Sequence, residues 1–281
     1  MAEVTQDPAA AAPQGGEVVR RHRLSTRLWH WINAAVLLIM LMSGLMIFNA
    51  HPRLYWGQYG ANPDPAWLQI GATQEEGYLR IGTIEVPTTG VLGRWTGSNG
   101  QEETRAFPSW ATIPSSYNLA LARRWHLTFA WLLSASILIY LGWSVVNGHL
   151  RRDLLPRRGE LSPRHIWTDI KSHARLRLPK GAAALRYNSL QKAAYLAVLV
   201  ILLPGMILTG LTMSPGMDAS WTWLLDLFGG RQSARSLHFI FAFLLVGFFV
   251  VHILMVLVAG PLNELRSMIT GRFRLPKEKD Q

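Results

Sequence analysis

The sequence contains no cysteine. This absence excludes iron–sulfur clusters held by thiolates, thiolate ligation of haem, disulfide bonds and covalent attachment of a c-type haem. Any redox cofactor in the chain must therefore be held by other side chains, of which histidine is the commonest metal ligand.

Charged residues are also scarce. They make up 16% of the 281 residues, whereas a soluble globular domain has about a quarter, and 49% of the residues are hydrophobic. The twelve tryptophans point the same way, because Trp concentrates at membrane–water interfaces. In a soluble protein the net charge of +11 would indicate nucleic-acid binding. Here the basic residues flank apolar runs, so they indicate membrane orientation and no nucleic-acid partner.

Four apolar runs are long enough to cross a bilayer, which requires about 20 helical residues. They cover residues 28–48, 125–146, 190–211 and 237–258. The predicted fold is an all-α integral membrane protein, a four-helix transmembrane bundle with a long periplasmic loop between helices 1 and 2. Pro204 should kink the third helix, because proline removes a backbone hydrogen bond.

The segments outside the runs differ in charge. Residues 149–188 and the tail 263–281 are basic, whereas residues 49–120 are slightly acidic. Because basic segments stay in the cytoplasm, both termini and the segment 149–188 are predicted to be cytoplasmic. Residues 49–120 are then periplasmic, and the protein belongs in a bacterial inner membrane. Residues 1–22 are interpreted as a disordered cytoplasmic tail, which leaves 23–262 as the membrane domain.

The loop 49–120 is too long to be a simple connection. Its short apolar pieces, WLQIG and RIGTIEV, are expected to form a small hairpin or to lie on the membrane surface. We expect the loop to cover the outer end of the bundle or to dock a partner.

Ionisable side chains inside membrane helices are rare and usually functional. Acidic residues are absent from the four runs. The runs contain one lysine, Lys192, at the start of the third. Four histidines lie within the runs, namely His30, His126, His238 and His252. One such histidine would be explained equally well by a hydrogen bond between helices, but four at paired depths favour metal ligation.

The spacing of these histidines assigns them to pairs. His238 and His252 are fourteen residues apart on one helix, which corresponds to about four turns and ~21 Å, so both rings leave the same face. In the predicted topology His126 lies at the periplasmic depth of His238, and His30 lies at the cytoplasmic depth of His252. Because imidazole is a normal axial ligand of haem iron, the sequence predicts two b-type haems, one for each pair.

Arginines flank the histidines and are candidates for binding the anionic haem propionates. They are Arg27 at the cytoplasmic end and Arg123, Arg124 and Arg235 at the periplasmic end. Membrane-flanking charge is the equally weighted alternative. The remaining histidines are interpreted as solvated, and they are His22, His51, His149, His165 and His173. No catalytic residue is predicted in this chain.

The segments RLWHW, RRWH and SLHFIFAFLLVGFFVVHILMV resemble the bacterial cytochrome b(561) family. More narrowly, they resemble the di-haem cytochrome b subunits of periplasmic formate dehydrogenases, nickel–iron hydrogenases and thiosulfate reductases. The resemblance covers all four runs and implies haem ligands on helices one, two and four. It also implies a quinone site near the cytoplasmic haem, in a region bordered by Arg27, Asn33 and His252. The long outer loop is similar to that of relatives that work with a molybdopterin oxidoreductase.

The predicted function is electron transfer through two haem b groups. Electrons would pass between a periplasmic oxidoreductase partner and the quinone pool, with quinone as an exchangeable substrate and lipid around the helices. A stand-alone, quinone-coupled redox enzyme of the superoxide oxidase or ferric reductase type is the alternative. A haem-free transporter is the third hypothesis, and it would require a broken helix or inverted repeats, neither of which is evident.

Overall fold

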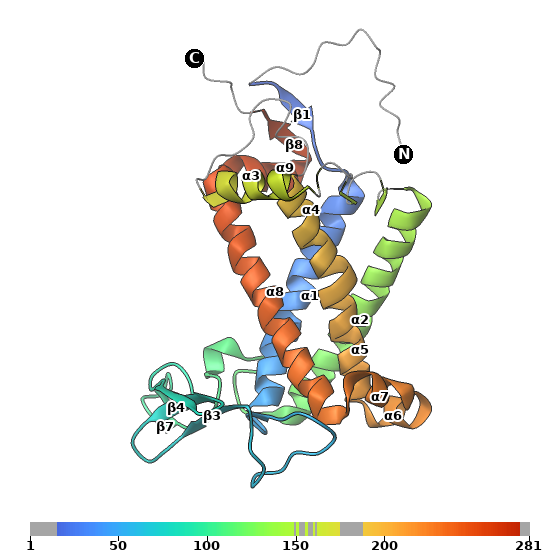
Figure 1. The fold of residues 1–281 in the computed structure, drawn as a ribbon. Coiled ribbons are helices and arrows are strands. Elements are labelled where there is room, and N and C mark those ends of the chain that lie inside the picture. The colour runs from blue at the N-terminus through green and yellow to red at the C-terminus, as the bar shows by residue number, and fades with distance from the viewer. Residues whose placement is uncertain are drawn as a thin grey trace. The chain divides into compact units, whose positions relative to one another are not determined.

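The computed structural model describes residues 16–148, 150–151, 155–156, 160, 162–174 and 188–275. Within these residues, four helical segments are long and apolar enough to cross a membrane (Figure 1). They are α1 (Leu24–Phe48), α2 (Leu119–Val146), the segment Ser189–Thr212 and α8 (Arg231–Ala259). The four predicted spans are confirmed, and the protein is a multi-pass membrane protein.

The third span contains a change of helix type. It consists of α4 (Ser189–Leu196), the π-helical segment η5 (Ala197–Leu202) and α5 (Leu203–Thr212). Pro204 has no N–H to donate to the carbonyl of Val200, and the wider π turn lies directly before it. The span is locally widened at the predicted position but remains one continuous helical segment.

The described residues form two compact units. The first unit falls within residues 1–32, 136–202 and 245–281, and the second consists of residues 33–135 and 203–244. Helices α1, α2 and α8 each contribute residues to both units.

The connection from α1 to α2 in the second unit is built from strands. A four-stranded antiparallel sheet contains β2 (Arg53–Leu54), β3 (Leu68–Ala72), β4 (Gly77–Ile81) and β5 (Ile84–Pro87) in sequence order. Strands β6 (Trp95–Thr96) and β7 (Glu102–Glu103) form a second pair, and the 3-10 helix η1 (Ser109–Ala111) follows. The predicted apolar pieces do form a hairpin. The all-α prediction is therefore corrected to a mostly helical fold that includes a small sheet.

This sheet is fixed to the ends of two membrane helices. Asn49, just after α1, exchanges two hydrogen bonds with the backbone of Phe107. Ser236 of α8 donates its hydroxyl to the carbonyl of Tyr55 and accepts from Trp67 Nε1. Because both attachments involve buried or half-buried groups, the loop is a folded part of the second unit. The same unit contains the short helices α6 (Pro215–Ser220) and α7 (Trp223–Phe228) after α5.

In the first unit the two ends of the described chain lie side by side. Strand β1 (Val18–Arg20) pairs antiparallel with β8 (Arg272–Arg274), which follows α9 (Pro261–Thr270). Helix α3 (Pro163–Ala174) also belongs to this unit. The sequence predicts a disordered tail over 1–22, but its described part forms an ordered strand. Residues 1–15 lie outside the described chain.

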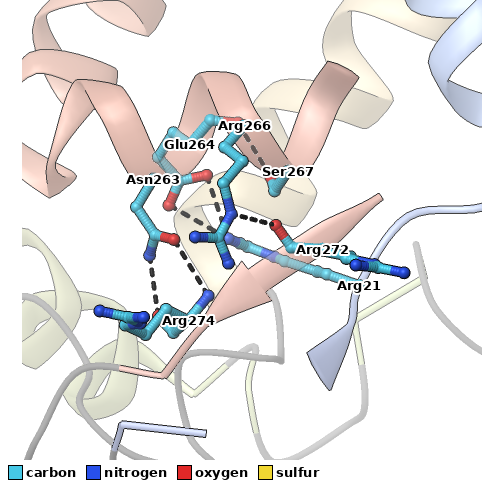
Figure 2. Close-up of polar contacts among 7 residues, drawn as sticks. All are labelled: Arg21, Asn263, Glu264, Arg266, Ser267, Arg272 and Arg274. Atoms are coloured by element: carbon cyan, nitrogen blue, oxygen red, sulfur yellow. Dashed lines mark hydrogen bonds and ion pairs between the residues drawn. The ribbon is translucent and has the colours of Figure 1, made fainter. Parts of the chain in front are cut away.

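Charged and polar side chains hold this terminal pair of strands in place (Figure 2). Arg21 donates to both carboxylate oxygens of Glu264 at 3.1 and 3.0 Å, and its guanidinium lies 4.4 Å from the centre of the Phe273 ring. Asn263 bonds to both the carbonyl and the N–H of Arg274. The terminal clasp is the name used below for β1, α9 and β8 together.

Substituting Glu264→Gln should loosen the terminal clasp. The exchange leaves Arg21 without its charged partner, and a half-buried ion pair of this kind contributes about 1 kcal/mol. We expect amide hydrogen exchange at Val18–Arg20 to become roughly fivefold faster, as measured by mass spectrometry. The control Glu85→Gln removes an exposed ion pair from β5 and should leave exchange in β1 unchanged. Unaltered exchange in Glu264→Gln would show that the strand pairing alone holds the clasp.

Candidate functional site

The first histidine pair lies in the second unit. His126 of α2 and His238 of α8 face each other with their ring centres 6.2 Å apart. This is the pairing that the sequence predicts for the periplasmic depth. It is called the outer pair below.

The ring of His126 is held through Nδ1 by α1. Nδ1 lies 3.1 Å from Ser43 Oγ and 3.1 Å from the carbonyl oxygen of Met40. The hydroxyl of Ser43 donates its own proton to the carbonyl of Ile39 at 2.7 Å, so its oxygen is available as an acceptor. Gly44 makes room for the ring, because a Cβ there would lie 3.2 Å from His126 Cε1.

The ring of His238 is held in the same way by α5. Its Nδ1 lies 3.0 Å from Thr209 Oγ1. The hydroxyl of Thr209 donates to the carbonyl of Gly205 at 2.7 Å and is thus an acceptor toward the ring. A Cβ at Gly210 would lie 3.5 Å from His238 Cε1.

These contacts determine the tautomer of the outer pair. The carbonyl of Met40 can only accept from His126 Nδ1, and the hydroxyls of Ser43 and Thr209 have already given their protons to backbone carbonyls, so each Nδ1 carries the proton and donates. Each Nε2 is then left with a free lone pair, which is the form that binds a metal.

The second histidine pair lies in the first unit. His30 of α1 and His252 of α8 have ring centres 6.3 Å apart, the pairing predicted for the cytoplasmic depth. It is called the inner pair. Phe248 lies against His252 with ring centres 5.9 Å apart. Trp31, next to His30, donates Nε1 to the carbonyl of Met268 in α9 at 3.1 Å, which ties this part of α1 to the terminal clasp.

The inner pair differs from the outer pair in its ring contacts. His30 Nδ1 is buried and has no hydrogen-bond partner among the described residues. A buried nitrogen without a partner is costly. A ligand that bonds to His30 Nδ1 would therefore explain why this nitrogen is buried here.

The separation of the rings fits one metal ion between each pair. An imidazole nitrogen binds a metal at roughly 2 Å and lies about 1.1 Å from its ring centre, so two rings on opposite sides of one ion have centres about 6.2 Å apart. The two observed separations, 6.2 and 6.3 Å, both agree with this value.

Two histidines alone do not complete a metal coordination shell. Among the described residues, no group of three or more His, Asp or Glu side chains is placed to hold an ion. Each pair therefore fits a metal whose other ligands arrive with it, as the four nitrogens of a haem macrocycle do.

The predicted propionate ligand Arg235 has protein partners instead. Its guanidinium donates to the carbonyls of Arg53 at 2.8 Å and His51 at 2.5 Å, and it lies 5.6 Å from the centre of the Phe48 ring. Arg235 thus binds the loop that follows α1. This role was not predicted from its position beside the span.

The other three candidate arginines differ in their environment. Arg123 and Arg124 are exposed on α2, three and two residues before His126. Arg27 lies one turn before His30, and its Nε is buried without a hydrogen-bond partner among the described residues. Among the four arginines, Arg27 therefore has a buried N–H that could donate a hydrogen bond to an anionic group beside the inner pair.

Two histidines interpreted as solvated are partly buried. Burial, followed by the charges of Arg21, His30 and Arg27, lowers the pKa of His22 to about 4. Burial also lowers the pKa of His51, which bonds to the hydroxyl of Tyr55 at 3.1 Å. Neither belongs to the two ring contacts between histidines found among the described residues. His149 and the side chains of His165 and His173 lie outside the described part of the chain.

The sequence prediction missed the hydroxyl residues Ser43 and Thr209. A signal for them exists in two similar segments, MLMSGL at 40–45 and MILTGL at 206–211. Each segment is followed along the chain by a helix in which an arginine lies three residues before a histidine. These sequences are RRWH at 123–126 and RSLH at 235–238. Comparing the first and second halves of the chain would have revealed both hydroxyls.

Fold and site together define a class: a multi-pass membrane protein that brings four histidines of its spans together in two pairs. The chain belongs to the prokaryotic cytochrome b561 family, whose model matches residues 21–271. It is thus a membrane haem protein of the cytochrome b type with a role in electron transfer. A relative from Azospira oryzae, named as a putative protein-methionine-sulfoxide reductase subunit YedZ1, is 28% identical over 259 residues, which are 91% of this chain and 98% of the relative. No solved structure matches the chain.

Replacing Thr209 by Val should alter the outer pair selectively. The change keeps the side-chain shape but removes the hydroxyl acceptor at His238 Nδ1, which lowers the basicity of the ligand. We expect about tenfold weaker haem retention at this pair and a higher midpoint potential in spectroelectrochemical titration. Thr212→Val is the matched control, because Thr212 is equally buried but its hydroxyl donates within α5 to Leu208. Equal effects of both variants would show that only helix packing is disturbed.

Proposed function

We propose that the outer pair, His126 with His238, and the inner pair, His30 with His252, are the axial ligands of two haem b groups. The observation that carries this proposal is the near-identical ring separation of 6.2 and 6.3 Å in two separate units. The free Nε2 atoms of the outer pair support it, because Nδ1 of each ring is already bonded.

The proposed path of the electrons crosses the membrane along α8. Haem b supplies one-electron redox chemistry when bound. Helix α8 contributes one ligand to each pair, and fourteen residues of continuous helix separate His238 from His252 by ~21 Å along its axis. Since the hydrocarbon core is ~30 Å thick, such a separation gives the two ligand pairs different depths. The bonds at Nδ1 hold the rings of the outer pair in fixed orientations, so little rearrangement accompanies a change of charge there.

We further propose that the electrons pass between a periplasmic oxidoreductase partner and the quinone pool. The name of the Azospira oryzae relative describes a reductase subunit, which supports a membrane subunit that works with a separate redox protein. The basic segments support cytoplasmic termini in a bacterial inner membrane, with residues 49–120 on the periplasmic side. A molybdopterin oxidoreductase is the partner class that the resemblance favours, and quinone is the proposed membrane substrate.

Arginine roles follow from the surroundings of each side chain. Arg27 is proposed to bind a propionate at the inner pair, because its Nε is buried and has no partner among the described residues. Arg123 and Arg124 are exposed and remain candidates for the same role at the outer pair. Arg235 is proposed to act there mainly through the backbone of residues 51–53, which its guanidinium binds.

The ligand assignment can be tested with purified protein. We expect two haems per chain by pyridine haemochrome assay and a low-spin, bis-histidine electron paramagnetic resonance spectrum. His238→Ala should reduce the content to one haem and leave the signal of the inner pair intact. His51→Ala is the control, since His51 lies outside both pairs and should not change the haem content. Retention of two haems in His238→Ala would contradict the assignment.

The proposed partner and substrate need a separate measurement. A quinol analogue should reduce the haems of the isolated protein, whereas reoxidation at catalytic rates should require the redox protein that co-purifies from native membranes. Rapid reduction of the isolated protein by superoxide, or its rapid reoxidation by a ferric chelate, would instead support the stand-alone enzyme. Failure of quinol to reduce the haems would exclude quinol as the direct electron donor without affecting the ligand assignment.

A further inference from the structure

One face of the small sheet in the second unit is apolar along its whole width. Residues directly opposite in an antiparallel pair, and alternate residues along a strand, share a face. The register pairs Leu68 with Ile81 and Ile70 with Leu79 across β3 and β4, and Leu79 with Val86 and Ile81 with Ile84 across β4 and β5. The apolar face therefore consists of Leu68, Ile70, Leu79, Ile81, Ile84 and Val86. The opposite face carries Gln69, Tyr78, Arg80 and Glu85.

The core of the second unit covers only part of this face. Leu68 and Ile70 on β3 are buried, with 7% and 3% of their surface exposed. Ile81, Ile84 and Val86 at the far side are 49%, 68% and 48% exposed. These three residues are called the apolar ridge. Strand β5 pairs only with β4 in the sheet, so the ridge lies at its free edge.

The residues that pack against the apolar face show which part of the second unit it faces. The buried cluster that contains Leu68 and Ile70 also includes Phe48 at the end of α1, and Phe239 of α8 packs against it. Phe239 in turn contacts Phe243, with ring centres 4.5 Å apart, and Phe243 is 41% exposed on the surface of the span. The apolar face is thus directed toward the membrane helices, and its cluster is continuous with their lipid-facing surface.

The chain after the sheet also returns toward the membrane span. The N–H of Ile113 donates to the carbonyl of Met42 at 3.2 Å. Met42 lies six residues before Phe48, the end of α1, which corresponds to ~9 Å along the helix. Trp110, in this returning segment, is 76% exposed. A tryptophan at such a level is typical of the membrane–water interface.

We propose that the apolar ridge inserts into the interfacial region of the bilayer, with Trp110, in the segment that returns to α1, as a second anchor. The sheet lies beside the end of α1 (Figure 1), so an apolar face directed toward the spans meets lipid wherever the helices do not cover it. The ligand is the apolar acyl boundary of the leaflet rather than a charged headgroup. Arg80 and Glu85 on the opposite face form an ion pair with each other at 2.6 Å, and they are the two charged residues of β4 and β5 (77–87), so these two strands offer no net charge. The polar face then remains directed to water.

The absence of cysteine from the chain allows this proposal to be tested with single spin labels. Ile84→Cys and Val86→Cys place a label on the ridge, and Glu85→Cys places the matched control on the opposite face of the same strand. Each labelled protein is reconstituted in phosphatidylcholine nanodiscs. Power-saturation electron paramagnetic resonance then compares collision with oxygen, which partitions into lipid, and with a water-soluble nickel complex.

We expect the labels at 84 and 86 to favour oxygen and the label at 85 to favour nickel severalfold. The two ridge labels should lie about 5 Å below the headgroup phosphates, which is the depth of interfacial segments. Nickel access at 84 and 86 equal to that at 85 would overturn the proposal. Protection of 84 and 86 only after a redox partner is added would also overturn it and would identify a protein-docking edge. Unchanged helical circular dichroism of each labelled variant shows that the fold is retained.

Discussion

The need to satisfy every polar group inside the hydrocarbon core governs this structure. A histidine ring in a membrane helix has two nitrogens, and each requires a partner that the lipid cannot supply. At the outer pair, one nitrogen of each ring is bonded to a hydroxyl of a neighbouring helix, and the nitrogen of His126 is bonded to a carbonyl as well. The hydroxyl proton is itself taken up by the carbonyl four residues earlier. Every group is then satisfied except the Nε2 atoms, which is the condition for binding a metal between the rings.

Much of this arrangement could be predicted because it depends on periodicity and charge. The four spans and the assignment of the histidines to pairs need only the helix repeat and a consistent topology. Ser43 and Thr209 could not be distinguished in that way, since hydroxyl residues are common in membrane helices and usually bond to their own backbone. Their role appears only when a second helix brings a ring nitrogen within 3.1 Å. The similarity of residues 40–45 to residues 206–211 is the sequence pattern that indicates this shared role.

The connection between α1 and α2 shows a different limit of sequence reasoning. The pieces WLQIG and RIGTIEV alternate as strands do, so a hairpin could be expected. The sequence could not predict which face of the hairpin would be covered, because the covering residues come from three distant parts of the chain, namely Phe48, Phe107 and Phe239. Arg235 illustrates the same point. Its position beside His238 indicates an anionic ligand, yet in the fold it meets the carbonyls of residues 51 and 53.

The two pairs are alike in ring separation but unlike in support, and this difference bears on how electrons would be exchanged. The outer rings are fixed by bonds within a unit that also contains the sheet. At the inner pair, the described residues leave His30 Nδ1 without a partner, and the adjacent Trp31 is bonded to the terminal clasp. A ring nitrogen without a partner can form a new hydrogen bond, whereas the Nδ1 atoms of the outer pair are already bonded. The inner pair therefore keeps one hydrogen-bonding position open to a further group, and the outer rings are the more firmly oriented of the two pairs.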